Sequence, residues 1–357
     1  MQHTTTGTSK IPLTRTGFPR APLQPGKSIF PETRKEHYAK RNEYPSKGIY
    51  SFTRLQESSH SDPGFLSGRV MLGRLLRCLN AFAPPLASRI AIHAFMQTRS
   101  RRVCTGQRPL STDSLDRDIP GAGNVRVWGT SGPWALLVHD WGKNSTMLYP
   151  IADRLARAGY RAVTFDAPSH GVAPGGKKCS MTDFAEVIAL FLRNLGKPHL
   201  VVAHGIGGIA SVSAATLETE PDRMVLLSTP CDLSMVLERW AYRLELPRSL
   251  IRRIRQELDL DGDSTLEDWD LRKQGRSLFC PVLVIHGQKD ALVPESETDR
   301  VVRAIPRAGA RIEPHLGHND ILMNKQVQEV ILAFSNSELA TRLQEPAAKR
   351  SRAKPTV

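Results

Sequence analysis

The chain lacks the cysteine spacing that would indicate a disulfide framework or a metal site. Its five cysteines (Cys78, Cys104, Cys179, Cys231 and Cys280) are scattered, and no two form a C-x-x-C pair. An odd, scattered set in a chain of this length favours reduced thiols and a cytoplasmic location. The eleven histidines also show no spacing typical of zinc ligands, so neither a metal nor another cofactor is expected.

Long apolar runs and, at the front of the chain, acidic residues are also missing. No stretch reaches the roughly 18–20 uncharged residues that a membrane-spanning helix needs. Residues 1–110 contain 18 Lys and Arg but 5 Asp and Glu, which accounts for +13 of the net charge of +14. Basic residues gather again after Pro346. Such ends are typical of solvated chain or of contact with an anionic surface; nucleic acid is not expected as a partner.

The length and texture of the sequence predict one domain with extensions. A chain of 357 residues can bury one large core. Residues 1–67 are rich in Thr, Pro, Ser, Lys and Arg and show no sustained period, so we expect a disordered basic extension there and a basic tail over 337–357. The change of texture at Met71 also admits a start of translation at that residue.

Residues 68–117 are predicted to form an amphipathic helical arm. Leucines recur from Leu72 to Leu79 at helical spacing with arginines between them, and Pro84-Pro85 divides the pattern into two helices. Two interpretations remain open. The arm packs against the body of the protein, or residues 71–100 contact a membrane surface and make the protein membrane-associated.

From residue 118 to 336 strand and helix signals alternate, which predicts a mostly parallel sheet with helices on both faces. The interval 232–279 is too long for an ordinary loop and has a helical pattern, so we expect an inserted helical cap over the strand ends. The expected strands are 124–128, 134–139, 162–165, 200–203, 224–227, 282–285 and 311–313, and the expected helices are 148–158, 181–195, 296–304 and 327–334.

The stretch from His199 to Gly208 predicts a sharp turn from a strand into a helix. Leu200 to Ala203 is a β-branched apolar run suited to a buried strand. Gly205, Gly207 and Gly208 follow within four residues, and small side chains are needed where a strained turn brings backbones together. This is the pattern of a nucleophile elbow, G-x-S-x-G, in which Gly205 stands where the serine would be.

Several further stretches, in this order, resemble the α/β-hydrolase superfamily in its serine-hydrolase, esterase-like branch. They are Leu-Leu-Val-His-Asp-Trp-Gly at 136–142, Phe-Asp-Ala-Pro-Ser-His-Gly at 165–171, Ala-His-Gly-Ile-Gly-Gly at 203–208, His-Gly-Gln-Lys-Asp-Ala-Leu-Val-Pro at 286–294 and Gly-His-Asn-Asp at 317–320. The resemblance covers residues 118–336. It implies the α/β-hydrolase fold and an activity on carboxylic esters.

The resemblance also implies roles for particular residues. Gly205 occupies the nucleophile position, Asp290 that of the triad acid and His318 that of the catalytic base, and the chain order nucleophile, acid, base is met. The backbone N–H groups of Trp141 and Ile206 would form the oxyanion hole. His139 and Asp166 match the pattern as scaffold residues that hold loops near the site.

Two departures from the pattern bear on function. Gly205 has no side chain, so no acyl-enzyme can form by the usual route. Asp140 stands where the family's His-Gly-Trp stretch has glycine, and its carboxylate, if it points inward, opposes the negative charge that an oxyanion hole must stabilise.

Three functions follow as expectations. The first is a homologue that is catalytically silent or very slow and binds a small apolar or acyl ligand in a capped pocket. The second is a weak hydrolase in which His318, oriented by Asp290, activates a water molecule in the space beside Gly205. The third is a membrane-surface or ligand-binding protein without catalysis.

Overall fold

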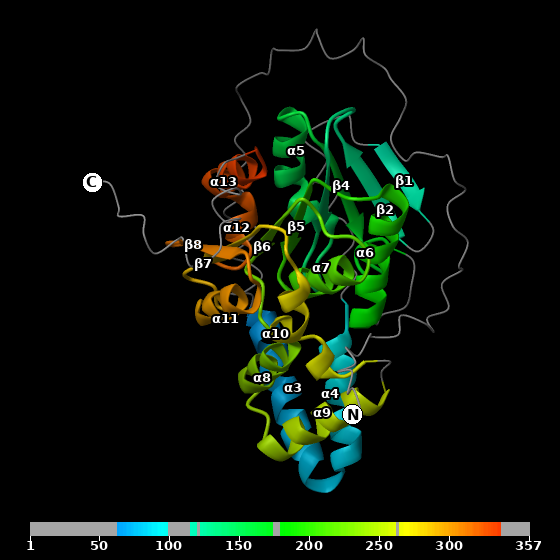
Figure 1. Cartoon of the computed structure of the whole chain (residues 1–357). Helices are drawn as coiled ribbons and strands as arrows, with labels where there is room; N and C mark the ends of the chain where they lie inside the picture. The colour runs from blue at the N-terminus through cyan, green and yellow to red at the C-terminus, as the bar shows by residue number, and fades with distance from the viewer. Residues whose placement is uncertain (1–62, 99–114, 120–121, 174–178, 262–263, 337–357) are drawn as a thin grey trace, which may run out of the picture.

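The computed structural model describes residues 63–98, 115–119, 122–173, 179–261 and 264–336 (Figure 1). Nearly all of the basic extension expected over 1–67, and all of the tail over 337–357, lie outside the described residues. Within the described part, no helix combines the length and the apolar character needed to cross a membrane.

An eight-stranded sheet forms the centre of the molecule, in the order β1-β2-β4-β3-β5-β6-β7-β8. β1, β2 and β4 pair antiparallel, and the other neighbouring strands are parallel. The strands are β1 (Leu115–Ile119), β2 (Ala122–Trp128), β3 (Trp134–Val138), β4 (Arg161–Asp166), β5 (Leu200–His204), β6 (Arg223–Leu227), β7 (Val282–Gly287) and β8 (Ala308–Glu313). The predicted mostly parallel sheet is therefore confirmed.

Helices cover both faces of this sheet, because its central strands bury side chains on both sides. Along β3, Leu136 and Val138 join the core beneath α6 (Met181–Leu195), α7 (Ile206–Leu217) and α11 (Ser296–Ala304), whereas Leu137 joins the core on the opposite face. That second core is completed by α5 (Tyr149–Arg157), α12 (Asp320–Met323) and α13 (Lys325–Asn336). The short 3₁₀ turns are Ser145–Leu148, Leu266–Asp268 and Gly275–Ser277.

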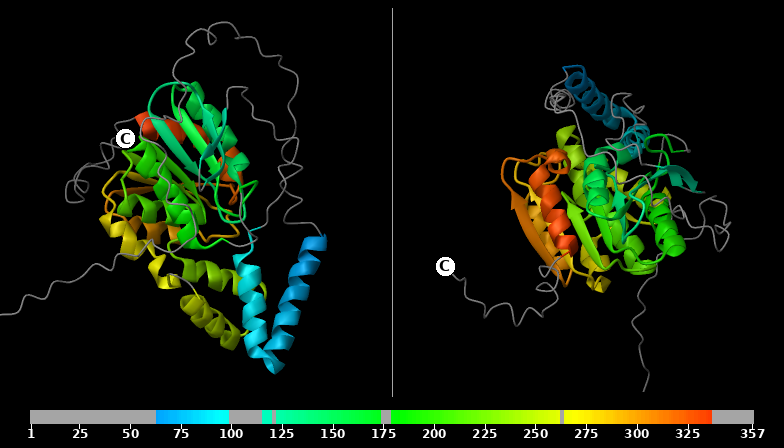
Figure 2. Two further views of the ribbon diagram at one scale, coloured as in Figure 1. Left: turned by 90° about the vertical axis from the view of Figure 1, so that its right-hand side faces the viewer. Right: turned by 90° about the horizontal axis from the view of Figure 1, so that it is seen from above.

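Two groups of helices stand together beyond the carboxyl ends of the parallel strands (Figures 1 and 2). One is the arm, made of α3 (Pro63–Phe82) and α4 (Pro84–Met96). The other, here called the inserted helices, lies between β6 and β7 and consists of α8 (Leu233–Arg243) and α9 (Arg248–Asp261). The short helix α10 (Leu271–Gln274), in the same interval, packs against α7 and α11. The arm packs against the inserted helices, because α4 contacts α9 and Ser88 donates a hydrogen bond of 2.6 Å to Glu257.

The arm and the sheet both begin earlier than the sequence pattern indicates. α3 starts at Pro63, whereas the arm was expected from residue 68. β1 over Leu115–Ile119 was not expected at all, because Leu-Asp-Arg-Asp-Ile has little apolar character. It is an edge strand that pairs with β2, and pairing of this kind is a tertiary contact that a short polar segment does not announce.

Gly73 permits the close contact between α3 and the turn after α8. A Cβ atom at this position would lie 2.5 Å from the carbonyl oxygen of Leu244, to which Arg77 donates a hydrogen bond of 2.9 Å. Gly73→Val should push α3 away from the turn, at a cost typical of overpacking, about 1–3 kcal/mol. We expect amide hydrogen exchange over residues 63–96 to accelerate about tenfold, while exchange in the sheet stays unchanged.

Gly68→Val is the matched control, because nothing lies within 4 Å of a Cβ atom at Gly68 on the same helix. The two substitutions change helix propensity equally. Equal acceleration of exchange in both variants would show that α3 is not held at Gly73.

Candidate active site

The turn between β5 and α7 has the geometry that its glycines predict. Gly205 has φ +55° and ψ −130°, a backbone conformation that costs a residue with a side chain about 1–3 kcal/mol. A Cβ atom at Gly207 would lie 2.3 Å from the carbonyl oxygen of His139, and one at Gly208 would lie 2.3 Å from Oγ1 of Thr229. The start of α7 therefore rests directly on the loops that follow β3 and β6.

Asp290 and His318 meet at the same edge of the sheet. Nδ1 of His318 donates to Oδ2 of Asp290 at 2.7 Å, and Oδ1 of Asp290 accepts the backbone N–H groups of Leu292 and Val293 at 2.8 and 2.9 Å. Burial would raise the pKa of the Asp290 carboxyl, but the His318 imidazole and these N–H groups together hold that pKa below its ordinary value. The two residues therefore form a buried carboxylate–imidazole pair.

Asp140 occupies the centre of the site, between Gly205 and His318. Its Oδ1 accepts the N–H of Ile206 at 2.8 Å, and its Oδ2 lies 3.1 Å from Nε2 of His318. A Cβ atom at Gly205 would lie 2.1 Å from this Oδ1 and 2.3 Å from the carboxyl carbon. The Asp140 carboxylate thus fills the space that any side chain at position 205 would need.

The oxyanion hole expected from the sequence is therefore not open in this structure. The Ile206 N–H was expected to point at a substrate oxygen, but it donates to a carboxylate of the protein instead. Trp141 lines the cavity described below, and its ring lies edge-on to the ring of His170, with centroids 5.3 Å apart.

His318 is held in its protonated form. Burial lowers the pKa of its imidazole, but the hydrogen bonds and charges of Asp140 and Asp290 outweigh burial and raise that pKa to about 9. For Asp140, burial is likewise outweighed by His318, and the pKa of its carboxyl falls well below the ordinary range. At neutral pH the site is a carboxylate–imidazolium–carboxylate chain with a net charge of −1.

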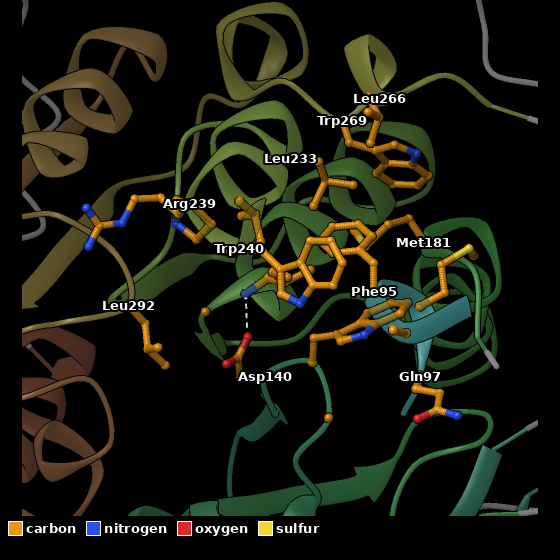
Figure 3. Close-up of a pocket in the computed structure, with 18 of the residues that line it drawn as sticks. Phe95, Gln97, Asp140, Met181, Leu233, Arg239, Trp240, Leu266, Trp269 and Leu292 are labelled. Atoms are coloured by element: carbon orange, nitrogen blue, oxygen red, sulfur yellow. Dashed lines mark hydrogen bonds between the residues drawn. The ribbon is translucent and has the colours of Figure 1, made fainter. Parts of the chain in front are cut away.

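A cavity of about 970 Å³ lies above these hydrogen-bonded side chains, and Asp140, Gly205 and His318 form its floor. Figure 3 shows Phe95 of the arm and Trp240 of α8 projecting across it. Its apolar walls come from the arm, from α6 and from the inserted segment: Leu72, Phe95, Met96, Met181, Leu233, Val236, Trp240, Leu258, Leu266 and Trp269. Of the other apolar residues in the expected cap, Leu237, Leu250 and Ile254 are buried in the core.

His139 and Asp166, which the resemblance identifies as scaffold residues, form hydrogen bonds that hold the loops around the floor. His139 donates through Nδ1 to the Asp140 carbonyl at 2.8 Å and accepts the Ala167 N–H at 3.0 Å, and Asp166 accepts the Ser145 N–H at 2.8 Å. These bonds fix the backbone from which the Asp140 side chain projects.

One group of potential metal ligands overlaps the floor. Asp140, His204 and His318 offer ligand atoms within 4.8 Å of one another. Nε2 of His204 donates to the His318 carbonyl at 2.9 Å, and both ring nitrogens of His318 face carboxylates. A metal at this position would have to displace the proton that His318 shares with Asp140.

Two features of the site are not indicated by the sequence pattern. The direct contact of Asp140 with His318 joins residues 178 positions apart, and the only available signal was the position of Asp140 beside Trp141. The arginines Arg239 and Arg243, which also line the cavity, could have been noticed only by their spacing of one helical turn.

The fold and the sequence both place the chain among known proteins. The family model of the alpha/beta hydrolase family matches residues 119–331, more than half of the chain. The chain therefore belongs to the α/β-hydrolase family, whose relatives include esterases.

Two curated relatives are named pimeloyl-[acyl-carrier protein] methyl ester esterase. The protein from Nitrosomonas europaea is 23% identical over 233 residues, covering 54% of this chain and 91% of the relative. The protein from Aeromonas salmonicida is 27% identical over 248 residues, covering 57% and 95%. The solved structure of E-2-(acetamidomethylene)succinate hydrolase matches with a TM-score of 0.50 and 24% identity over 63% of this chain and 99% of that chain, which shows a common fold.

The imidazole of His318 links stability to pH. Its pKa of about 9 in the folded protein lies above the value of 6.5 for an unperturbed histidine, so the folded state binds the proton more tightly. This contribution to stability is fully present below about pH 6.5 and is lost as the pH rises through about 9. We expect the free energy of unfolding, measured by denaturant titration, to fall across that interval.

Asp140→Asn removes one of the two carboxylates that face His318. The pKa of His318, followed by NMR, should then fall by about one unit or more, because an opposite charge at this distance shifts a pKa by about 1–3 units. Asp153→Asn is the control, since Asp153 pairs with Arg157 on α5 at 2.8 Å. An unchanged His318 titration in Asp140→Asn would contradict the arrangement described.

Proposed function

We propose that this protein binds a small apolar or acyl ligand in the cavity and does not hydrolyse esters at the rates usual for its family. The observation that carries this proposal is the Asp140 carboxylate, which fills the nucleophile's space and takes up the Ile206 N–H. An ester carbonyl brought to this floor meets no nucleophile and faces an anion where negative charge would develop.

The loss in kcat that is expected without a nucleophile supports this proposal. Removal of the nucleophile from a serine protease costs about 2 × 10⁶ in kcat. The remaining activity of such variants depends largely on the oxyanion hole. Here the Ile206 donor is also engaged, so this second contribution is diminished as well.

The geometry weighs against the water-mediated alternative at neutral pH. A general base must accept a proton, but the pKa of His318 is raised to about 9 and its Nε2 donates to Asp140. The general-base contribution, about 10²–10⁴-fold, is therefore withheld while Asp140 stays ionised.

The ligand class follows from the cavity walls and from the relatives. The walls are mainly apolar and aromatic, and about 970 Å³ accommodates an acyl chain. The curated relatives are named as esterases of a pimeloyl ester, which is an acyl compound. An acyl ligand is therefore consistent with both.

A repair experiment tests the proposal. In the double variant Asp140→Gly/Gly205→Ser, the serine has room, the Ile206 N–H is released, and His318 loses the carboxylate that holds its proton. We expect hydrolysis of short p-nitrophenyl esters to rise at least about a hundredfold above wild type, taking the general-base contribution as a lower limit.

The single variants separate the effect of the missing nucleophile at position 205 from that of the carboxylate at position 140. Gly205→Ser alone should stay inactive, because its Cβ atom would lie 2.1 Å from Asp140 Oδ1. Asp140→Gly alone supplies no nucleophile, and His318→Ala in the double background should abolish the gain. Hydrolysis of these esters by the wild-type protein at rates usual for the family would overturn the proposal.

The arm favours a second function, attachment to an anionic membrane surface. Several of its large apolar side chains face solvent: Val70, Met71, Leu75, Phe82 and Leu86, with exposed fractions of 51, 67, 50, 90 and 49%. Between residues 63 and 96 there are four arginines and no acidic residue. We propose that this face rests on anionic lipid, because apolar insertion and arginine–phosphate attraction then act together.

Sedimentation with vesicles tests the attachment. Phe82→Ser should reduce binding to phosphatidylserine-containing vesicles about tenfold, since a buried Phe side chain contributes about 1.5–3 kcal/mol. Phe279→Ser is the control, because Phe279 is 59% exposed and precedes β7 at the opposite end of the strands. Equal loss in both variants, or a dimer that Phe82→Ser converts to a monomer, would overturn this second proposal.

A further inference from the structure

The cavity is lined by side chains of opposite charge. The Asp140 carboxylate lies on the floor, whereas Arg69 of the arm and Arg239 and Arg243 of α8 line another part of the wall. Arg239 and Arg243 are one helical turn apart, and both donate to the carbonyl oxygen of Ala291, Arg239 at 3.0 Å. Figure 3 shows Arg239 at the edge of the site, away from Asp140.

Both α8 arginines bond to a neutral carbonyl oxygen rather than to a carboxylate. In the part of the chain that the structure describes, neither forms an ion pair with a carboxylate, and the buried Nε of Arg239 has no hydrogen-bond partner. Two other arginines of the inserted segment do pair with carboxylates: Arg255 with Glu238 at 2.9 Å and Arg272 with Asp270 at 2.7 Å.

The guanidinium groups of Arg69, Arg239 and Arg243 also repel one another. Burial lowers the pKa of Arg243, and the charges of Arg69 and Arg239 lower it further, against the smaller opposing effect of the Asp290 carboxylate. Like charges gathered around a partly buried position are unfavourable unless an anion lies between them. An anionic group of a ligand would relieve this repulsion and would accept a hydrogen bond from the Nε–H group of Arg239.

The floor of the cavity repels an anionic group of a ligand. A carboxylate or phosphate placed beside Asp140 would face its negative charge, and the Ile206 N–H that could bind an anion is already engaged. An anion in this cavity is therefore stable only beside Arg239 and Arg243, and the apolar walls contact the rest of the ligand.

We infer that the ligand is an amphiphile whose carboxylate or phosphate is held by Arg239 and Arg243 and whose apolar chain extends toward Asp140. This inference rests on the proposed ligand binding and specifies its chemistry. It also sets the orientation: the charged end lies at the arginines, and the chain contacts Phe95, Trp240 and the neighbouring apolar walls.

Calorimetric titration of the full chain with monomeric twelve-carbon amphiphiles tests the inference. The probes are dodecanoate, dodecyl phosphate, methyl dodecanoate and dodecyltrimethylammonium. Both anions should bind at least about tenfold more tightly than the neutral ester, as charge-assisted hydrogen bonds to an anion predict, and the cation should bind most weakly. The two anions distinguish a carboxylate from a phosphate head group.

Arg239→Gln and Arg243→Gln should each weaken binding of the anions about tenfold and leave the neutral ester unaffected, which also shows that the cavity remains folded. Arg255→Gln is the matched control, because Arg255 already pairs with Glu238. An equal loss in Arg255→Gln would indicate general surface attraction and overturn the inference.

The remaining outcomes separate this inference from the proposed function. If neutral and anionic probes bind equally and the arginine variants change nothing, the cavity binds apolar ligands but the arginines do not select them, and only this inference fails. If no amphiphile binds to the wild-type chain, the proposed function fails with it.

Discussion

The carboxylate–imidazolium–carboxylate chain of Asp140, His318 and Asp290 is the interaction on which the rest of the site depends. It joins the loops that follow β3, β7 and β8, and through the Ile206 N–H it also joins the start of α7. Each member is buried, and a buried charge is tolerated only when it is paired and hydrogen-bonded. Removal of any one member would leave another charge without its partner.

The hydrogen-bonded group of Asp140, His318 and Asp290 changes the charge of the site, while the fold of the family is kept. Asp290 and His318 are in contact at 2.7 Å, and Asp140 places an anion beside His318 and the Ile206 N–H. The floor therefore resists negative charge. The apolar walls of the cavity come mainly from the arm and the inserted segment rather than from the sheet, and in the proposed function these walls contact the ligand.

Much of the fold could be predicted from the sequence because its signals are local. Leu200–Ala203 is apolar and β-branched, and the glycines after it mark the turn into α7. The helix over 181–195 was predicted with its observed bounds, because Gly196 marks its end locally. In the structure, Ser180 and Asp183 also form a capping box at its start. β1 escaped prediction because its polar residues gain their strand conformation only by pairing with β2.

For the site, the sequence by itself determined the residue types and their order along the chain: Gly205, then Asp290, then His318. Only the tertiary structure decided that Asp140 turns inward, because its direction depends on contacts with Ile206 and His318, 66 and 178 residues away. Side-chain direction and the pKa of a buried group depend on neighbours that are close in space and distant in sequence. The chemical type of the site is thus readable from the sequence, and its charge state only from the fold.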